Sequence, residues 1–356
     1  MSKLRVRALL IAAVVCCASA IAQAELKTWE FSGNGQWPQV ATSAPSTQSS
    51  PAPELDRAAE LLEQRSARNA EKITIQWLKV HKSHPQRDRA LFLIARALYD
   101  YGNRIRAFYY CDELLDEYPD SRFFYPALEL QYNVADHYLN GYKRRFLGLP
   151  MFHAYEEAVE MLYRVQNRSP GSPLAEQSLL RTADFYFADR QYDFAADTYA
   201  AYVRSYPRSP QVPRARLREA LANYAQFRGP KFDGTPIIDA REQLRALAAS
   251  YPNLSQEENI PALLEQIDRD LARKLYYTGD FYRRTNEPRG AAYTFKYLTR
   301  AFPQAPEAQR AQAALDKLPQ WAVASVPEPA IMPEFAPGSP PMEPPRLLPS
   351  DRTQTK

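Results

Sequence analysis

An aromatic residue followed by proline recurs along this chain of 356 residues, each time at the end of a helix-like stretch. Pro85 and Pro119 are 34 residues apart, which is the period of a tetratricopeptide unit, and Pro170 and Pro207 are 37 apart. The spacing therefore predicts a repeat of helical hairpins. The full steps are Tyr118-Pro119, Tyr206-Pro207, Tyr251-Pro252 and Phe302-Pro303, and the looser ones are His84-Pro85 and Ser169-Pro170.

The residues between these prolines test the repeat position by position. A two-helix unit of this class needs small residues where its helices cross and large ones where they interlock. If the closing proline is position 32, three units carry a small residue at positions 8 and 20 and mainly larger apolar ones at 11, 24 and 27. In that order of position (8, 11, 20, 24, 27), they are Ala95, Leu98, Ala107, Cys111 and Leu114; Ala183, Tyr186, Ala195, Tyr199 and Tyr202; and Gly279, Tyr282, Ala291, Phe295 and Leu298.

Three further units fit this register only in their second helix. Residues 123–139 and 213–225 are predicted as first helices, and each precedes an insertion that contains Gly and Pro, at 141–153 and 227–236. We expect these insertions to fold back on their own repeats, and the three cations at 143–145 leave a contact with a membrane surface open. The matching second helices contain Ile73/Trp77/Val80, Ala158/Leu162/Val165 and Ala240/Leu244/Leu247.

The sequence thus predicts an all-α fold, a tetratricopeptide-type α-solenoid of about six helical hairpins over residues 54–318. A solenoid of this length needs no single large core, because each repeat packs on its neighbours. Residues 25–53 are predicted to be a disordered linker. Residues 319–356 hold ten of the 30 prolines and are predicted to be a disordered, Pro-rich tail.

The amino terminus has the order of charged, apolar and small residues that is typical of a secretory signal, predicted here to be residues 1–24. We therefore expect an exported protein. Ala22-Gln23-Ala24 is an ordinary cleavage site and favours soluble release. Cys16 and Cys17 leave lipidation open, although neither follows a small residue.

Charge and catalytic motifs narrow the class of function. Removal of the signal leaves 42 basic residues against 41 acidic ones, which argues against nucleic acid as a partner. The histidines lack metal-ligand spacing, and no phosphate loop or nucleophile elbow is present, so we expect no metal, no cofactor and no enzyme. Cys111 is predicted to be a small buried hydrophobe, and the pairs Asp112/Asp116 and Glu113/Glu117 a solvated helix face.

The surface that a solenoid offers to partners is lined by positions 2, 5, 9 and 12 of its first helices. In this chain those positions are rich in arginine and aromatic residues, which are enriched at protein interfaces. They are Arg89, Phe92, Arg96 and Tyr99 in the second hairpin, Gln177, Leu180, Asp184 and Phe187 in the fourth, and Arg273, Tyr276, Asp280 and Arg283 in the last.

Three stretches resemble the BamD family of outer-membrane β-barrel assembly lipoproteins. They are Ser178–Pro210, the helix Asp239–Asn253 that ends in Tyr-Pro-Asn, and the final hairpin Leu271–Ala305, which an additional helix at Ile260–Arg273 precedes. The resemblance is strongest over 175–315. It implies that the carboxy-terminal repeats contact a BamA-like barrel-assembly subunit and that the amino-terminal groove receives unfolded outer-membrane proteins.

This resemblance makes a scaffold in outer-membrane β-barrel assembly the first functional hypothesis. The chain departs from the family in its degenerate lipidation motif and in its longer ends. The alternative is a periplasmic cell-envelope coordinator or peptide-binding module that resembles the tetratricopeptide proteins of the Tol-Pal system. An amino-terminal coiled coil would favour that alternative, and the helix predicted at Glu54–Arg68 is too short to form one.

Overall fold

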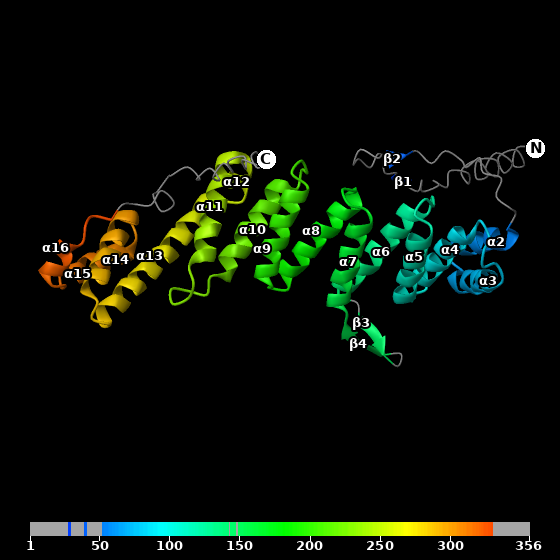
Figure 1. The fold of residues 1–356 in the computed structure, drawn as a ribbon, viewed down its shortest axis with the longest axis horizontal. Helices are drawn as coiled ribbons and strands as arrows, with labels where there is room; N and C mark the ends of the chain where they lie inside the picture. Colours follow the sequence, from blue (N-terminus) through cyan, green and yellow to red (C-terminus); the bar gives the residue numbers. More distant parts are fainter. Residues whose placement is uncertain (1–27, 30–38, 41–51, 142, 147–148, 330–356) are drawn as a thin grey trace, which may run out of the picture. The chain divides into compact units, whose positions relative to one another are not determined.

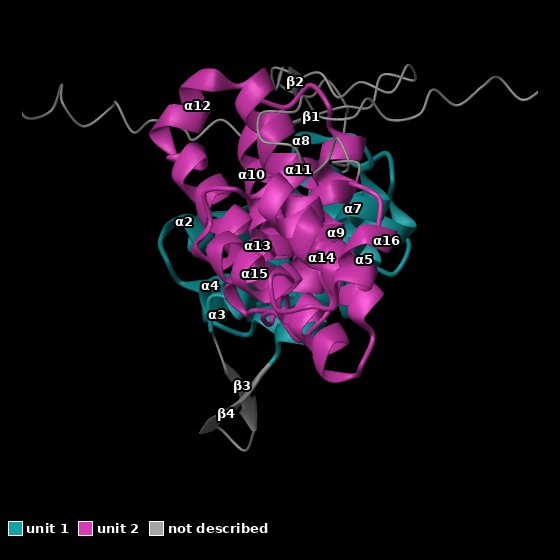
Figure 2. Ribbon diagram, turned by 90° about the vertical axis from the view of Figure 1, so that its left-hand side faces the viewer, with its two compact units in different colours: residues 1–174 teal, residues 175–356 magenta. Residues whose placement is uncertain are grey.

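The computed structural model describes residues 28–29, 39–40, 52–141, 143–146 and 149–329. The predicted signal, most of the predicted linker and the tail beyond residue 329 lie outside these ranges. The chain divides into two compact units, residues 1–174 and 175–356, which Figure 2 colours separately. The boundary falls in the first turn of helix α8, Pro173–Ala188.

Unit 1 is a run of helices in which each helix packs on the next one along the chain (Figure 1). The first hairpin begins at Pro53, and the aromatic-proline step at residue 118 closes the second. Strand β1, Thr28–Trp29, pairs antiparallel with β2, Gln39–Val40. The helices are α2 Pro53–Glu63, α3 Ala67–Val80, α4 Arg87–Asp100, α5 Arg104–Glu117, α6 Phe124–Leu139 and α7 Tyr155–Arg168.

The insertion between α6 and α7 is a two-stranded antiparallel hairpin. Strand β3, Lys143–Phe146, pairs with β4, Leu149–His153, and the register shifts between Arg144 and Arg145. The sequence predicted an insertion here from its Gly and Pro content and assigned no strands to it. Pro150 lies opposite Arg145 in this short pair, where each strand has a free edge, and an edge strand tolerates proline.

Unit 2 continues the same pattern of paired helices (Figure 1). The predicted extra helix and the first helix of the last hairpin form one continuous helix, α13. The helices are α8 Pro173–Ala188, α9 Tyr192–Ser205, α10 Val212–Gln226, α11 Thr235–Ser250, α12 Pro252–Glu257, α13 Ile260–Arg284, α14 Pro288–Ala301, α15 Pro306–Leu315 and α16 Gln320–Ser325.

The aromatic-proline steps end helices as predicted. Tyr118, Tyr206, Tyr251 and Phe302 are the C-caps of α5, α9, α11 and α14, and each has φ between −134 and −126° and ψ between 57 and 70°. A proline disfavours the helical conformation of the residue before it, which explains this shared geometry. The repeat spacing therefore reflects a recurrent helix stop.

A second recurrent feature is a left-handed residue in the turn inside each well-matched hairpin. Gly102, Arg190 and Asn286 have φ of 99, 62 and 62°, and all three fall at position 15 of their units. A left-handed residue just past the end of a helix lets the chain reverse while its backbone groups bond to the last turn. The register therefore fixes the turn as well as the helix contacts.

The predicted helix crossings are confirmed. Ala95 and Ala183 have no exposed surface, and their partners Cys111 and Tyr199 are equally buried. The crossing at Gly279 is closest: a methyl group there would lie 2.5 Å from Cε1 of Phe295. A separation that short forces one helix to move, so only glycine fits.

Two predicted interior positions are wrong. Val80 is 75% exposed, and Tyr282 is 36% exposed. In the first hairpin Trp77 and Leu78 are the last buried side chains of α3, and His81 and His84 pack on the ring of Trp77 at centroid distances of 4.6 and 5.0 Å. Position 27 of this hairpin, Val80, therefore lies outside the core.

The carboxy-terminal boundary also differs from the prediction. The chain continues past residue 318 into the short helix α16, and Ala322, Val326 and Pro329 are buried. Proline content suggested an unstructured tail from residue 319. Its first eleven residues instead place apolar side chains against α14 and α15, and burial of that surface offsets the ordering cost.

Candidate protein-binding surfaces

The predicted surface of the second hairpin is partly internal. Phe92 is 7% exposed and stacks on Phe123 at a centroid distance of 5.1 Å, so the expectation of an exposed ring there is wrong. Arg89 forms an ion pair with Asp56 at 2.8 Å. Tyr99 lies half-buried beneath the guanidinium of Arg104, which is 5.3 Å from the ring centroid.

Arg96 is the most exposed of the four, with 53% of its side chain accessible and a loose pair to Asp100 at 3.9 Å. Burial raises the pKa of Asp100, and the nearby Arg96 opposes that rise. Of the four residues predicted to contact a partner, the second hairpin therefore exposes mainly the side chain of Arg96.

The fourth hairpin uses two of its predicted surface residues to hold its own core. Asp184 accepts a hydrogen bond of 2.5 Å from the hydroxyl of the buried Tyr199. Phe187 packs edge-on against Tyr192 and Tyr199, and Arg218 lies 5.5 Å above its ring. Gln177 is exposed, as predicted.

The last hairpin places its two predicted arginines on the surface. The side chains of Arg273 and Arg283 are 53% and 48% exposed, and they pair with Asp270 at 2.9 Å and with Asp280 at 2.6 Å. Tyr276 is half-buried and packs on Phe295 at 5.8 Å, so its predicted exposure is wrong. The ring of Tyr276 belongs to the core, and the two cations remain available to a partner.

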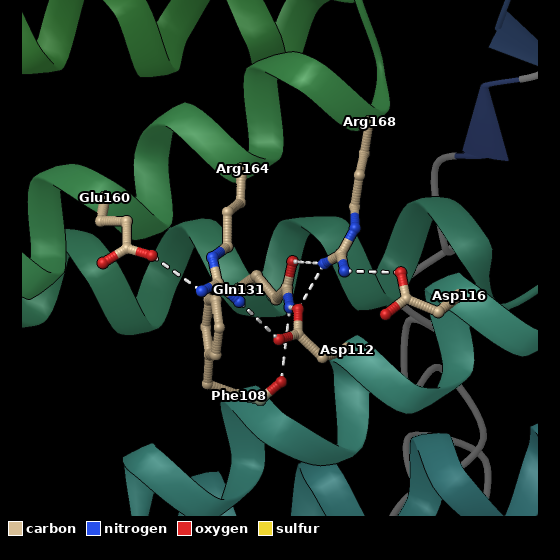
Figure 3. A network of polar contacts seen from close by, with 7 residues as sticks. All are labelled: Phe108, Asp112, Asp116, Gln131, Glu160, Arg164 and Arg168. Atoms are coloured by element: carbon tan, nitrogen blue, oxygen red, sulfur yellow. Dashed lines mark hydrogen bonds and ion pairs between the residues drawn. The ribbon is translucent and has the colours of Figure 1, made fainter.

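A polar network that the sequence did not predict connects α5, α6 and α7 (Figure 3). Asp112 accepts hydrogen bonds from Gln131 at 2.6 Å, from Arg164 at 3.1 Å and from Arg168. Arg168 also donates to the side-chain oxygen of Gln131 at 3.0 Å and to Asp116 at 2.7 Å.

The side chain of Asp112 is only 14% exposed, which corrects the prediction that it belongs to a solvated face. A charged group this deeply placed requires partners, and two guanidinium groups and one amide supply them. The network stabilises the packing of three successive helices. Its members are engaged with one another, so this face offers little to a partner.

A buried cation joins two helices of unit 2. Arg241 of α11 is 1% exposed, donates from Nε to Asp268 of α13 at 2.5 Å and lies 5.6 Å from the ring centroid of Phe302. A buried guanidinium is tolerated when an acceptor and an aromatic face replace its water. It fixes α13 against α11 and is no binding residue.

The insertion at 227–236 contacts α13, the first helix of the next hairpin, whereas the sequence predicted that it folds back on its own repeat. Lys274 of α13 donates to the carbonyl of Phe232 at 2.5 Å, and Lys231 lies 5.8 Å from the ring of Tyr277. Phe232 itself is 54% exposed. The loop is therefore tied to α13 at its centre and presents one aromatic ring outward.

The outer face of α14 is the surface that sequence reasoning missed. Arg289, Tyr293, Lys296 and Arg300 follow one another at intervals of four, three and four residues, which places them on one side of the helix. Tyr293 is 47% exposed, and Trp321 of α16, beneath Arg289 at 5.5 Å, is 59% exposed. This α14 stripe was visible as a basic-aromatic periodicity in residues 289–300.

Groups with reactive potential are few in the described part of the chain. Burial raises the pKa of the Cys111 thiol far above its usual value, aided by Asp112, so the thiol stays protonated. Cys16 and Cys17 lie outside the described residues. Among residues 52–141 and 149–329, no three His, Cys, Asp or Glu side chains gather as a metal site. No helix of the described ranges has both the length and the apolar content of a membrane span.

Comparison with known proteins agrees with this geometry. Residues 152–318 match the family model YfiO, described as outer membrane lipoprotein. This segment is therefore similar to the YfiO family. The match starts at the end of the β3–β4 hairpin and ends after α15, so the YfiO region contains the third hairpin's second helix and all three later hairpins. It confirms the resemblance stated for the BamD family, of which YfiO is another name.

No curated protein matches the chain. Among solved structures, the chain is similar to the C-terminal part of a TPR repeat-containing protein from Cytophaga hutchinsonii, at 13% identity and a TM-score of 0.36. That similarity covers 74% of this chain and 88% of the other. The tetratricopeptide-type fold rests on the register of the helices rather than on this superposition.

Proposed function

We propose that this protein is a non-enzymatic scaffold of outer-membrane β-barrel assembly, exported to the periplasmic face of the outer membrane. The match of residues 152–318 to an outer membrane lipoprotein family carries the proposal. The helical repeats support it, because stacked hairpins expose long surfaces that suit protein partners. The proposed partners are a barrel-forming subunit and unfolded outer-membrane proteins.

Within this function, the exposed arginines of the YfiO region are the proposed contacts of the barrel-forming subunit. Arg273 and Arg283 both lie on α13, and each forms an ion pair with a carboxylate of the same helix. Braced arginines lose little side-chain entropy on binding, which favours them as interface residues. In the amino-terminal repeats, Arg96 is the corresponding candidate.

The test is affinity purification of the full chain from detergent-solubilised envelopes, with mass spectrometry of the co-eluting proteins. A β-barrel assembly subunit is expected, and depletion of the protein should lower the amounts of outer-membrane β-barrels. Co-elution of Tol-Pal proteins without any barrel-assembly subunit would contradict the proposal.

The mode of attachment is tested separately, by the mature amino terminus and by labelling with a fatty-acid analogue. We propose cleavage after Ala24, so the mature chain should begin Glu25-Leu26-Lys27 and remain unlabelled. Labelling that disappears when Cys16 and Cys17 are replaced by Ser would show a lipid anchor instead.

A further inference from the structure

Residues 319–329, called the strap here, lie along the α14 stripe. Trp321 sits beneath Arg289 at 5.5 Å, Val323 and Val326 meet Lys296, and Glu328 and Pro329 meet Arg300. The strap therefore follows α14 from its first turn to its last, in the same direction. Figure 1 shows α16 beside α14 and α15 at the carboxy-terminal end of unit 2.

The hydrogen bonds between the two are made almost wholly to backbone. The ammonium group of Lys296 donates to the carbonyls of Val323 and Val326, both at 3.0 Å, and Arg300 donates to the carbonyl of Pro329 at 3.1 Å. Because every residue has a carbonyl, these contacts recognise a backbone path rather than one sequence. This is how grooves that bind extended peptides gain affinity.

Apolar contacts supply the selectivity. Val326 is 8% exposed and belongs to the core cluster that includes Leu298 and Leu315, and Pro329 is also buried. Pro327 and Glu328 between them are exposed. This alternation, with two buried residues three apart, suits an extended proline-containing segment, since such segments turn once every three residues.

The site is larger and more positive than the strap requires. A recess of about 360 Å³ remains between α14, α15 and the strap, lined in part by Thr299, Gln312 and Asp316. The stripe has three cations, whereas the strap offers one carboxylate, Glu328, which lies 3.8 Å from Lys296 and 3.9 Å from Arg300 and is 70% exposed. Asp316 of α15 adds one carboxylate to the lining of the recess, so the cations still outnumber the carboxylates. The strap thus leaves space unfilled and charge uncompensated.

We propose that the α14 stripe is a recognition site for an extended, proline-containing acidic segment of another protein, and that the strap occupies it in cis. The strap is short, and its buried apolar contacts in the described residues are few, so a segment with additional carboxylates competes with it. The tail repeats the strap's own Val-Pro-Glu pattern as Met332-Pro333-Glu334. The strap therefore blocks the site within its own chain until a more acidic segment displaces it.

The proposal is tested by fluorescence anisotropy with a labelled peptide of residues 320–330. The full mature chain is compared with a variant, Val326→Gly/Pro329→Gly, whose strap is weakened while the α14 stripe is intact. A tethered ligand competes at an effective concentration near the millimolar range. We therefore expect the weakened-strap variant to bind the peptide at least about tenfold more tightly than the unaltered chain.

Two cations of the α14 stripe are then replaced in the weakened-strap variant. Lys296→Met/Arg300→Met should lower peptide affinity at least about tenfold, whereas Arg310→Met, an exposed cation of α15, should leave it unchanged. Circular dichroism of each variant checks that helix content is kept. Absence of saturable binding to the weakened-strap variant, or equal binding after loss of both cations, would overturn the proposal.

A second peptide tests the acidic preference. Pro327→Glu adds a carboxylate at an exposed position beside the two cations, so this peptide should bind several-fold more tightly than the original, and less so at high salt. Weaker or equal binding would overturn the acidic character of the partner. These measurements use the purified chain, so their outcome is independent of whether the protein serves β-barrel assembly.

Discussion

The hairpin of α8 and α9 and the hairpin of α13 and α14 share one register but close their cores in different ways. Position 24 is Tyr199 in the first and Phe295 in the second, and neither residue has exposed surface. The hydroxyl of Tyr199 reaches out to Asp184, whereas the ring of Phe295 ends against Gly279. The same repeat can thus connect its core to a surface carboxylate or seal it beneath a glycine.

The difference decides which surface residues are free. Position 9 is Asp184 in the first hairpin, where it serves the buried tyrosine, and Asp280 in the second, where it braces Arg283 and Arg284. A carboxylate that satisfies a buried hydroxyl cannot be given up to a partner without cost. The sealed hairpin therefore has the freer surface, and it is the one on which we place the partner contacts.

The largest effect is expected at the glycine seal. Gly279→Leu should destabilise the protein by about 3 kcal/mol or more, because even the first added carbon meets Phe295 at 2.5 Å. Ala183→Leu, at the same position of the other hairpin, should cost about 1–3 kcal/mol. Urea unfolding measures both, and Ala313→Leu on the exposed face of α15 serves as the control.

A double-mutant cycle sharpens this prediction. Gly279→Ala alone should be destabilising, and Phe295→Leu should remove part of that loss by shortening the side chain that the new methyl group meets. A coupling energy of about 0.5–3 kcal/mol is expected for residues in contact. Strict additivity of the two substitutions would break the assigned contact between α13 and α14.

The next effect comes from exchanging the two core rings. Phe295→Tyr adds a hydroxyl to a ring that has no exposed surface and lies against Gly279, so it should cost about 1–3 kcal/mol. Tyr199→Phe removes one hydrogen bond but leaves Asp184 within 3.8 Å of Arg218, so about 1 kcal/mol is expected. Suppose thermal melting ranks the two substitutions in the opposite order. The contrast between a core ring hydrogen-bonded to a surface carboxylate and a core ring packed against glycine is then wrong.

A smaller effect concerns alkaline stability. Burial, together with the hydrogen bond to Glu176, raises the pKa of Tyr202 to about 12, from an ordinary value near 10. A raised pKa means that the folded state holds the phenol proton more firmly. Its stabilising contribution is therefore complete below about pH 10 and is lost as pH rises toward 12.

Leu298 occupies the equivalent position of the sealed hairpin and cannot titrate. Tyr202→Phe should therefore flatten the fall of urea stability between pH 10 and 12, and Tyr293→Phe on the exposed face of α14 should not. An unchanged slope in Tyr202→Phe would show that this phenol is equally acidic in the folded and unfolded chain.

The three hairpins that match the register best show what the sequence can predict. Ala183 and Gly279 were placed correctly at helix crossings because a repeat imposes local spacing, and local spacing can be counted along the chain. Phe92 and Tyr276 were misplaced because register says which side of a helix a residue occupies but not which neighbour covers it. Phe92 is covered by Phe123, which lies outside the register, and Tyr276 packs on Phe295, a core ring that the register placed without showing that it covers its neighbour.

The repeat pattern could not predict contacts between residues that are far apart in the sequence. Asp112 and Arg168 are 56 residues apart, and their meeting depends on how α5, α6 and α7 cross. The strap was missed for a different reason, since proline content outweighed the apolar side chains of Val326 and Pro329. Composition indicates how costly a segment is to order, but burial of two side chains can offset that cost in a short segment.

The smallest effect on stability, and the most direct test of the freer surface, is expected at Arg283. Arg283→Ala removes an exposed pair, and Asp280 keeps Arg284 at 3.0 Å, so the unfolding free energy should change by less than about 0.5 kcal/mol. If α13 carries the partner contacts, Arg273→Ala/Arg283→Ala should still lower recovery of the envelope partner.

Asp184→Ala should have the opposite effects. It leaves the Tyr199 hydroxyl without its acceptor and should cost about 1–3 kcal/mol of stability, but it should not change partner recovery at temperatures where the variant is folded. Equal recovery with the double arginine variant and the unaltered chain would place the binding surface away from the sealed hairpin, because nothing in its folding would have changed.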